Sequence, residues 1–146
     1  MTSSEFLILL ENFKKFMLNK GFSVIGCSDE QIFQLEDKYG KLPCFYKIYL
    51  SIFGLEAGDF KKGTDILYSE LDDINIYSIE LLEENDIRIP LNFFSFLLHQ
   101  GYSSLFFIDR QCDDPDVYVY TEGDKIRKIN LKFSECLLAE IDHYKE

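Results

Sequence analysis

Residues 93–109, FFSFLLHQGYSSLFFID, place two apolar runs on either side of the tetrad His99-Gln100-Gly101-Tyr102. Both runs are short and rich in phenylalanine, which is typical of strands buried on both faces. The first run also suits a short turn that leads into a strand. Gly101 adopts without strain the positive φ that a hairpin turn requires. The stretch therefore predicts an antiparallel hairpin.

His99 raises the alternative of a catalytic site, because imidazole titrates near neutrality. A catalytic base needs an orienting group, a nucleophile or metal, and a cradle for the substrate. Nothing in the sequence pairs His99 with the other histidine, His143. We therefore interpret the tetrad as a turn, with the ring of His99 capping backbone groups at the strand end.

Two more strands are predicted after the hairpin, at residues 117–120 and 126–129. Turn residues fill the gaps before them, in 113–116 (DDPD) and 122–124 (EGD). Because the gaps are short, we expect neighbouring strands to run antiparallel. The second half of the chain therefore predicts a strand meander.

Helical periodicity marks the rest of the chain. One helix is predicted over residues 6–17, and a second begins at the capping box Ser28-Asp29-Glu30-Gln31. A third begins at Pro43, where a missing N–H costs nothing, and a closing helix is predicted over 133–141.

Residues 56–63 are loop-like, residues 66–68 predict a short strand, and residues 72–86 predict an acidic helix. The order of elements predicts one α+β domain over residues 1–146, in which N-terminal helices and a C-terminal helix pack on a mostly antiparallel sheet.

The cysteines contain no C-x-x-C pair, so no tight zinc knuckle is predicted. We expect reduced thiols and neither a metal nor a cofactor. No apolar run approaches the roughly 18 residues of a membrane span. The first residues lack the basic region and cleavage site of a secretory signal, and these features together predict a cytoplasmic protein with no membrane partner.

Motifs for known chemistry are absent from the sequence. Asp113-Asp114-Pro115-Asp116 suggests a calcium loop, but its spacing does not fit an EF-hand. No phosphate-binding loop, dinucleotide fingerprint, nucleophile elbow or H-E-x-x-H motif occurs. A hydrolase that uses paired carboxylates stays open among 26 acidic residues. We predict no catalytic residues and no enzyme activity.

Negative charge is concentrated in one part of the chain. The net charge is −11, and residues 64–124 hold fourteen Asp or Glu against only Arg88 and Arg110. Such a field repels nucleic acid and anionic lipid and attracts a basic partner. An acidic surface that only keeps the protein soluble is the alternative.

The order of motifs resembles the SUKH superfamily, which includes the Smi/Knr-type cell-wall-assembly regulators. The matching segments are Ser28-Asp29-Glu30-Gln31-Ile32 with Leu35-Glu36 and Gly40, Leu42-Pro43 with Tyr46-Lys47, Leu50 and Gly54, His99-Gln100-Gly101-Tyr102, Phe106-Phe107, Asp114-Pro115 with Val117-Tyr118, and Phe133 with Leu137. They span residues 28–141, nearly the whole chain.

The resemblance implies an α+β domain without catalysis, used by many bacterial members as an immunity protein that blocks a cognate toxin, often a nuclease. A regulatory or scaffold module that binds a host protein is the alternative. We expect a monomer or weak dimer and a basic protein partner. The predicted partner-binding residues are Asp72, Asp73, Glu80, Glu83, Glu84 and Asp86, followed by Asp113, Asp114 and Asp116.

Overall fold

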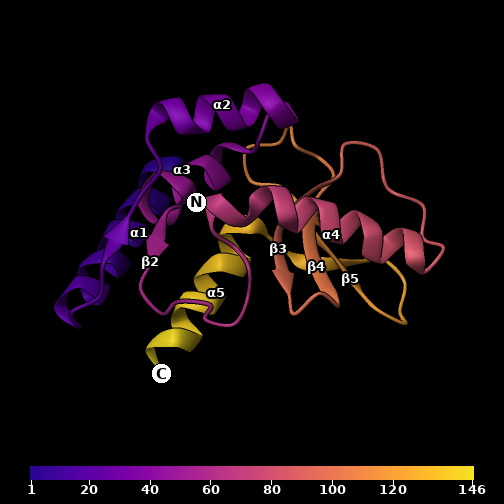
Figure 1. Cartoon of the computed structure of the whole chain (residues 1–146). Coiled ribbons are helices and arrows are strands. Elements are labelled where there is room, and N and C mark those ends of the chain that lie inside the picture. The colour runs from indigo at the N-terminus through magenta and orange to yellow at the C-terminus, as the bar shows by residue number, and fades with distance from the viewer.

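The structure is a computed structural model that describes residues 1–146. It has five α-helices and two antiparallel sheets (Figure 1), so the predicted α+β class is confirmed, whereas the small second sheet was not predicted. The elements in chain order are α1 (Ser3–Asn19), β1 (Val24–Ile25), α2 (Asp29–Tyr39), α3 (Cys44–Phe53), β2 (Glu56–Ala57), the 3-10 turn η1 (Tyr68–Glu70), α4 (Leu71–Glu84), β3 (Phe94–His99), β4 (Ser103–Phe107), β5 (Asp116–Thr121), β6 (Arg127–Lys132) and α5 (Phe133–Lys145).

The main sheet is a meander in the order β3-β4-β5-β6, with every pair antiparallel. The predicted hairpin is confirmed as β3 and β4. Three residues, Gln100, Gly101 and Tyr102, separate the paired His99 and Ser103. The first two have positive φ, 49° at Gln100 and 76° at Gly101, as the central residues of a type I′ turn do. The ring of His99 contacts a side chain rather than the backbone, since its Nδ1 lies 2.7 Å from the Thr64 hydroxyl.

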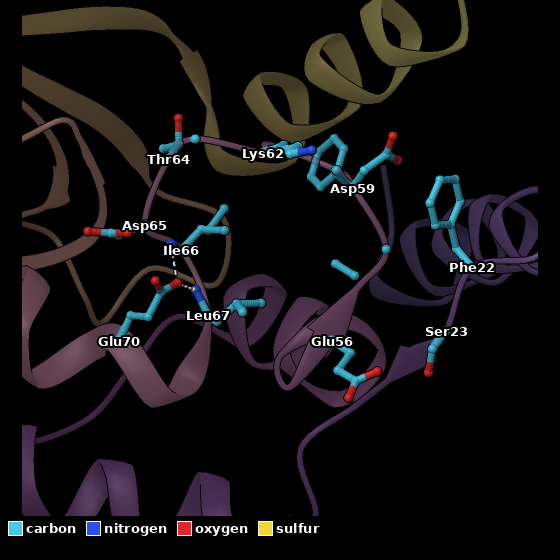
Figure 2. Close-up of a pocket in the computed structure, with 14 residues that line it drawn as sticks. Phe22, Ser23, Glu56, Asp59, Lys62, Thr64, Asp65, Ile66, Leu67 and Glu70 are labelled. Carbon is cyan, nitrogen blue, oxygen red and sulfur yellow. Dashed lines mark hydrogen bonds between the residues drawn. The ribbon is translucent and has the colours of Figure 1, made fainter.

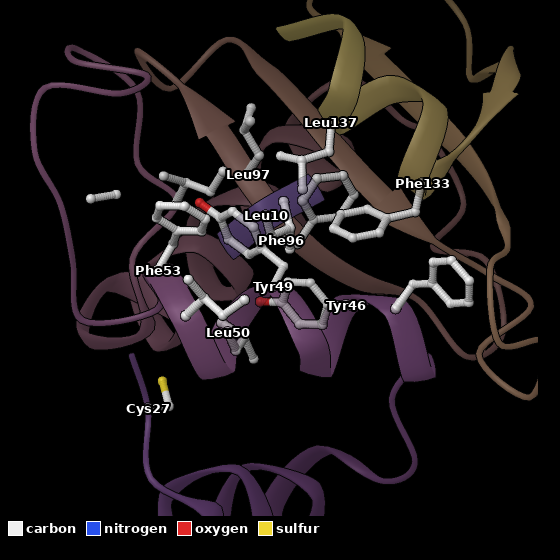
Figure 3. Packing of buried hydrophobic residues seen from close by; sticks show 14 of the residues in the cluster. Leu10, Cys27, Tyr46, Tyr49, Leu50, Phe53, Phe96, Leu97, Phe133 and Leu137 are labelled. Atoms are coloured by element: carbon white, nitrogen blue, oxygen red, sulfur yellow. The ribbon is translucent and has the colours of Figure 1, made fainter. Parts of the chain in front are cut away.

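Helices cover both faces of this sheet. On one face, α1, α3 and α5 enclose an aromatic core in which the ring of Tyr46 contacts those of Phe96, Phe107 and Phe133 (Figure 3). On the other face, α4 packs Leu82 into a smaller cluster with Phe106. Because neighbouring strand residues point to opposite faces, Phe106 and Phe107 serve different cores. In Figure 1, α4 crosses in front of the strands.

Two contacts close the outer edge of β3. The side-chain amide of Asn75 in α4 donates to the Ser95 carbonyl oxygen (2.9 Å) and accepts from the Ser95 N–H (2.8 Å). Further along, the backbone of Asp65 exchanges two hydrogen bonds with Leu98, of 2.9 and 3.0 Å. The edge strand therefore finds hydrogen-bond partners within its own chain.

A buried polar network fastens α4 to the sheet. The hydroxyl of Ser78 donates to that of Ser95 (3.2 Å), which lies 2.7 Å from the hydroxyl of Ser104. All three serines are buried. Because buried polar groups without partners are costly, this network favours one placement of α4 over others.

The prediction of a strand at residues 66–68 is wrong. The amides of Ile66 and Leu67 donate to Oε1 of Glu70, at 3.2 and 3.0 Å, and the chain turns into η1. The loop predicted from residue 56 in turn contains the short strand β2, which pairs with β1. None of the helices combines the length and apolar character of a membrane-spanning helix.

Candidate protein-binding surface

Helix α4 has two chemically distinct sides. Leu71, Ile74, Leu81 and Leu82 are buried at helical spacing against the sheet. The seven residues of the opposite side are all exposed, and we call them the acidic face of α4: Asp72, Asp73, Ile76, Tyr77, Glu80, Glu83 and Glu84. The predicted acidic residues of this segment are thus brought together on one surface.

Two apolar side chains lie within the acidic face. Ile76 and Tyr77 are each 52% exposed. Residues three and four apart are neighbours on a helix, so both side chains lie between Asp73 and Glu80. Tyrosine is one of the residue types enriched among the anchor residues of protein interfaces.

Most carboxylates of the acidic face have no partner in the protein. Asp72 is the exception, since its Oδ1 accepts from Nζ of Lys38 at 2.8 Å and from the Tyr39 hydroxyl. Both bonds lower the pKa of the Asp72 carboxyl below its ordinary value, and the bond from Lys38 has the larger effect. The ion pairs of the protein include none at the other four carboxylates, nor at Asp86 in the turn after α4.

The last turn of α4 places its charges unfavourably. Glu83 and Glu84 lie at the negative end of the helix dipole, and no basic residue is present in that turn. A cation at this position stabilises the helix by about 0.3–1 kcal/mol, and an acidic side chain destabilises it. Glu80 and Glu84, four residues apart, also repel each other by roughly 0.2–0.5 kcal/mol. At this end, the acidic face therefore opposes the stability of its own helix.

The second predicted group, residues 113–116, is largely engaged inside the protein. Asp114 caps α5, accepting from the Ser134 N–H at 2.9 Å and from the Ser134 hydroxyl. Asp116 pairs with Lys128 at 3.4 Å. Asp113 is exposed, and its backbone carbonyl accepts from the Phe45 N–H at 3.0 Å. The structure thus gives this group a role in joining α3, α5 and β6.

Sequence reasoning missed the apolar part of the surface. Ile76 and Tyr77 fall outside the stripe defined by Leu71, Ile74 and Leu81. This departure from the helical spacing of the buried residues is the sequence signal by which they could be identified. Phe33 on α2 is a second residue of this kind, 70% exposed on the outer side of its helix.

A shallow groove of about 570 Å³ borders the start of α4 (Figure 2). Its lining includes Glu56, Asp59, Asp65 and Glu70. Two of these carboxylates are engaged, since Glu70 accepts from two backbone amides and Asp59 accepts from the Tyr144 hydroxyl. Partial burial raises the pKa of the Asp65 carboxyl, and the neighbouring Glu70 raises it further. The lining also contains Lys62, so the groove combines these carboxylates with a cation.

His99 and the four cysteines are the groups with the most reactive chemistry outside the carboxylates. The imidazole of His99 bonds to Thr64 and meets Tyr102 edge to face, with no hydrogen bond to a carboxylate that would orient it. All four cysteines are free thiols, and burial raises the pKa of Cys27 to about 11. No three His, Cys, Asp or Glu side chains are grouped so that they could hold a metal ion.

Comparison of the chain with protein-family models, curated proteins and solved structures finds no significant match. Membership of the SUKH superfamily therefore stays a prediction. The acidic face of α4 is the feature on which a functional proposal can rest, because it combines two exposed apolar side chains with four carboxylates that form no ion pair in the protein.

Proposed function

We propose that this protein binds a basic protein through the acidic face of α4, and that its partner is a bacterial toxin which it neutralises. The observation that carries the proposal is the set of four exposed carboxylates around Ile76 and Tyr77 that no cation of the protein meets. A solubilising surface would not need acids at the C-terminal end of a helix, where they are unfavourable. Features that break a local rule without a gain for the fold are typical of functional sites.

The two kinds of residue have separate expected roles. The carboxylates steer a positively charged partner, which raises association rates by roughly 10- to 1,000-fold at low salt. Ile76 and Tyr77 then supply apolar contact once water is expelled, as interface anchors do. Association should therefore slow steeply with added salt, while dissociation depends mainly on the two apolar side chains.

A nuclease is the expected class of toxin. Enzymes that act on nucleic acid hold phosphates with lysine and arginine, so their active clefts are basic. A row of carboxylates along a rigid helix presents such a cleft with negative charges in place of the substrate. Blocking by occupation of the cleft requires no catalysis by this protein.

The proposal can be tested by photo-crosslinking from within the surface. A photoreactive amino acid replaces Tyr77 in the full chain, expressed in the cells that make it. The matched control carries the same replacement at Ile8 on α1, which is 60% exposed. We expect a basic protein to be crosslinked from position 77 and not from position 8. Equal crosslinking from both positions, or an acidic partner, would contradict the proposal.

Charge reversal then tests the role of the carboxylates. The variant Asp73→Lys/Glu80→Lys/Glu84→Lys should lose the crosslink and remain folded, because all three side chains are exposed. The variant Glu11→Lys/Glu122→Lys/Asp142→Lys changes the net charge equally at exposed positions elsewhere and should keep it.

The captured protein decides between toxin and host factor. If it arrests growth when produced alone, and this protein restores growth, neutralisation is supported. If it is a host protein whose production is harmless, the regulatory alternative replaces the toxin in the proposal.

A further inference from the structure

The two outer edges of the main sheet differ. The edge of β3 is closed by the Asn75 side chain and the Asp65 backbone, as described above. β6 forms a strand ladder on one side only, with β5, and none of its six residues is buried. An edge strand of this kind presents a row of backbone N–H and C=O groups without strand partners.

The open edge also carries a net positive charge. Residues 124–132 hold Lys125, Arg127, Lys128 and Lys132 against one carboxylate. Arg127 pairs with that carboxylate, Asp124, at 3.2 Å, and Lys128 pairs with Asp116. The side chains of Lys125, just before the strand, and Lys132, its last residue, form no ion pair. The backbone N–H of Lys132 donates to Oε1 of Glu135 at 2.9 Å, so the open part of the edge ends before Lys132.

We propose that β6 is a docking edge for an extended acidic segment of a partner protein, which adds to the sheet as a fifth strand. Strand addition takes its affinity from main-chain hydrogen bonds and its specificity from the side chains beside them. Carboxylates on the incoming strand would face Lys125 and Lys132, and opposite charges across a strand pair are favourable. The half-exposed Leu131, at 37%, offers an apolar contact within the strand.

Charge also argues against a second copy of this chain as the occupant. Two β6 strands side by side would bring lysine and arginine against lysine and arginine, which is unfavourable. The acidic face of a second copy is helical, and a helix has no free backbone groups with which to pair an edge. An acidic strand is the occupant that satisfies both the backbone and the charge.

The test uses the full chain labelled with ¹⁵N and a synthetic peptide of about eight residues, within the usual length of a strand, in which glutamate alternates with valine or threonine. We expect saturable shift changes confined to β6 and β5, and slower hydrogen exchange at β6 amides. The variant Lys125→Glu/Lys132→Glu should weaken binding about tenfold. The matched variant Lys15→Glu/Lys41→Glu, at exposed lysines without ion pairs, should bind as the parent does.

Control peptides separate strand addition from simple charge attraction. The same peptide N-methylated at alternate residues keeps its charge but loses donors on one edge, and we expect no binding. Equal binding of the methylated peptide, shifts spread over all basic residues, or no saturable shift would overturn the proposal. So would concentration-dependent self-association of the free protein through β6. The proposal does not depend on the acidic face, and the triple lysine variant of α4 should bind the peptide as well as the parent does.

Discussion

The two sides of α4 follow opposite rules. On the buried side, the amide of Asn75 and the hydroxyl of Ser78 both have hydrogen-bond partners. Leu81 and Leu82 are buried on the same side and pack in the smaller core cluster. On the exposed side, four carboxylates have no internal partner, and two apolar side chains are left in water. The sheet therefore accounts for the sequence of the inner side. The packing of the sheet does not account for the outer side, which carries the residues of the proposed function.

The largest expected effect is on the inner side. Leu82→Ala removes a fully buried side chain and should lower the free energy of unfolding by about 2–5 kcal/mol. Ile76→Ala, at a half-exposed position on the same helix, should change it by less than about 0.5 kcal/mol. Urea denaturation measures both. Similar losses for the two variants would show that the outer side also serves the fold.

Asn75→Ala tests how firmly α4 holds the edge of β3. The change leaves the N–H and C=O of Ser95 without their partner and should cost about 1–3 kcal/mol. Hydrogen exchange at the Ser95 amide should also become faster. Asn12→Ala, at an exposed position of α1, is the control and should leave stability nearly unchanged. An unchanged exchange rate at Ser95 in Asn75→Ala would count against edge closure by this side chain.

Removing charge from the end of α4 should strengthen the fold. Glu83→Gln/Glu84→Gln relieves the unfavourable contact with the helix dipole and should raise the free energy of unfolding by about 1 kcal/mol at low salt. Asp73→Asn should lower it slightly, because acids in the first turn are favourable. Thermal unfolding at low and high salt measures both changes. A loss of stability in the double glutamine variant would contradict the conflict between charge and fold described for this face.

The smallest expected effect concerns pH. The folded-state pKa of Asp72 is lowered by Lys38 and Tyr39, so its contribution to stability is present above the ordinary carboxyl pKa of about 3.9 and is lost as pH falls through the lowered value. The raised pKa of Asp65 acts oppositely, since its contribution is present in acid and is lost as pH rises through the raised value.

Asp72→Asn should therefore lower the melting temperature slightly at neutral pH and hardly at all once the pH is below the lowered pKa of Asp72. Asp65→Asn should raise it slightly at neutral pH. Because the Asp72 carboxylate is 58% exposed, solvent keeps its effect small. If Asp72→Asn and the parent had the same melting temperature from acid to neutral pH, the bonds of Asp72 to Lys38 and Tyr39 would contribute nothing to stability.

Local patterns of the sequence predict the elements well and their tertiary partners poorly. The hairpin around Gly101, the capping box at Ser28 and the acidic helix are confirmed, because each depends on residues close in sequence. The strand predicted at residues 66–68 is wrong, because the carboxylate of Glu70 binds the amides that a strand partner would take.

The candidate site shows the same limit. The crowding of carboxylates on α4 is visible in the sequence, since helical spacing alone brings them to one side. The engagement of Asp114 by Ser134, twenty residues away, is not visible, because it depends on how the loop meets α5. Nor does the sequence show that Lys38 reaches Asp72 while Asp73 has no ion pair.

The closed edge of β3 also limits how copies of this protein can join. A cross-β fibril grows because every added unit offers a fresh template on its far side. Here a unit that met a neighbour through β6 would present only the edge blocked by Asn75 and Asp65, and elongation would stop at that step. Even in concentrated solution, or with the lysines of β6 neutralised, assembly by this route should end at a pair.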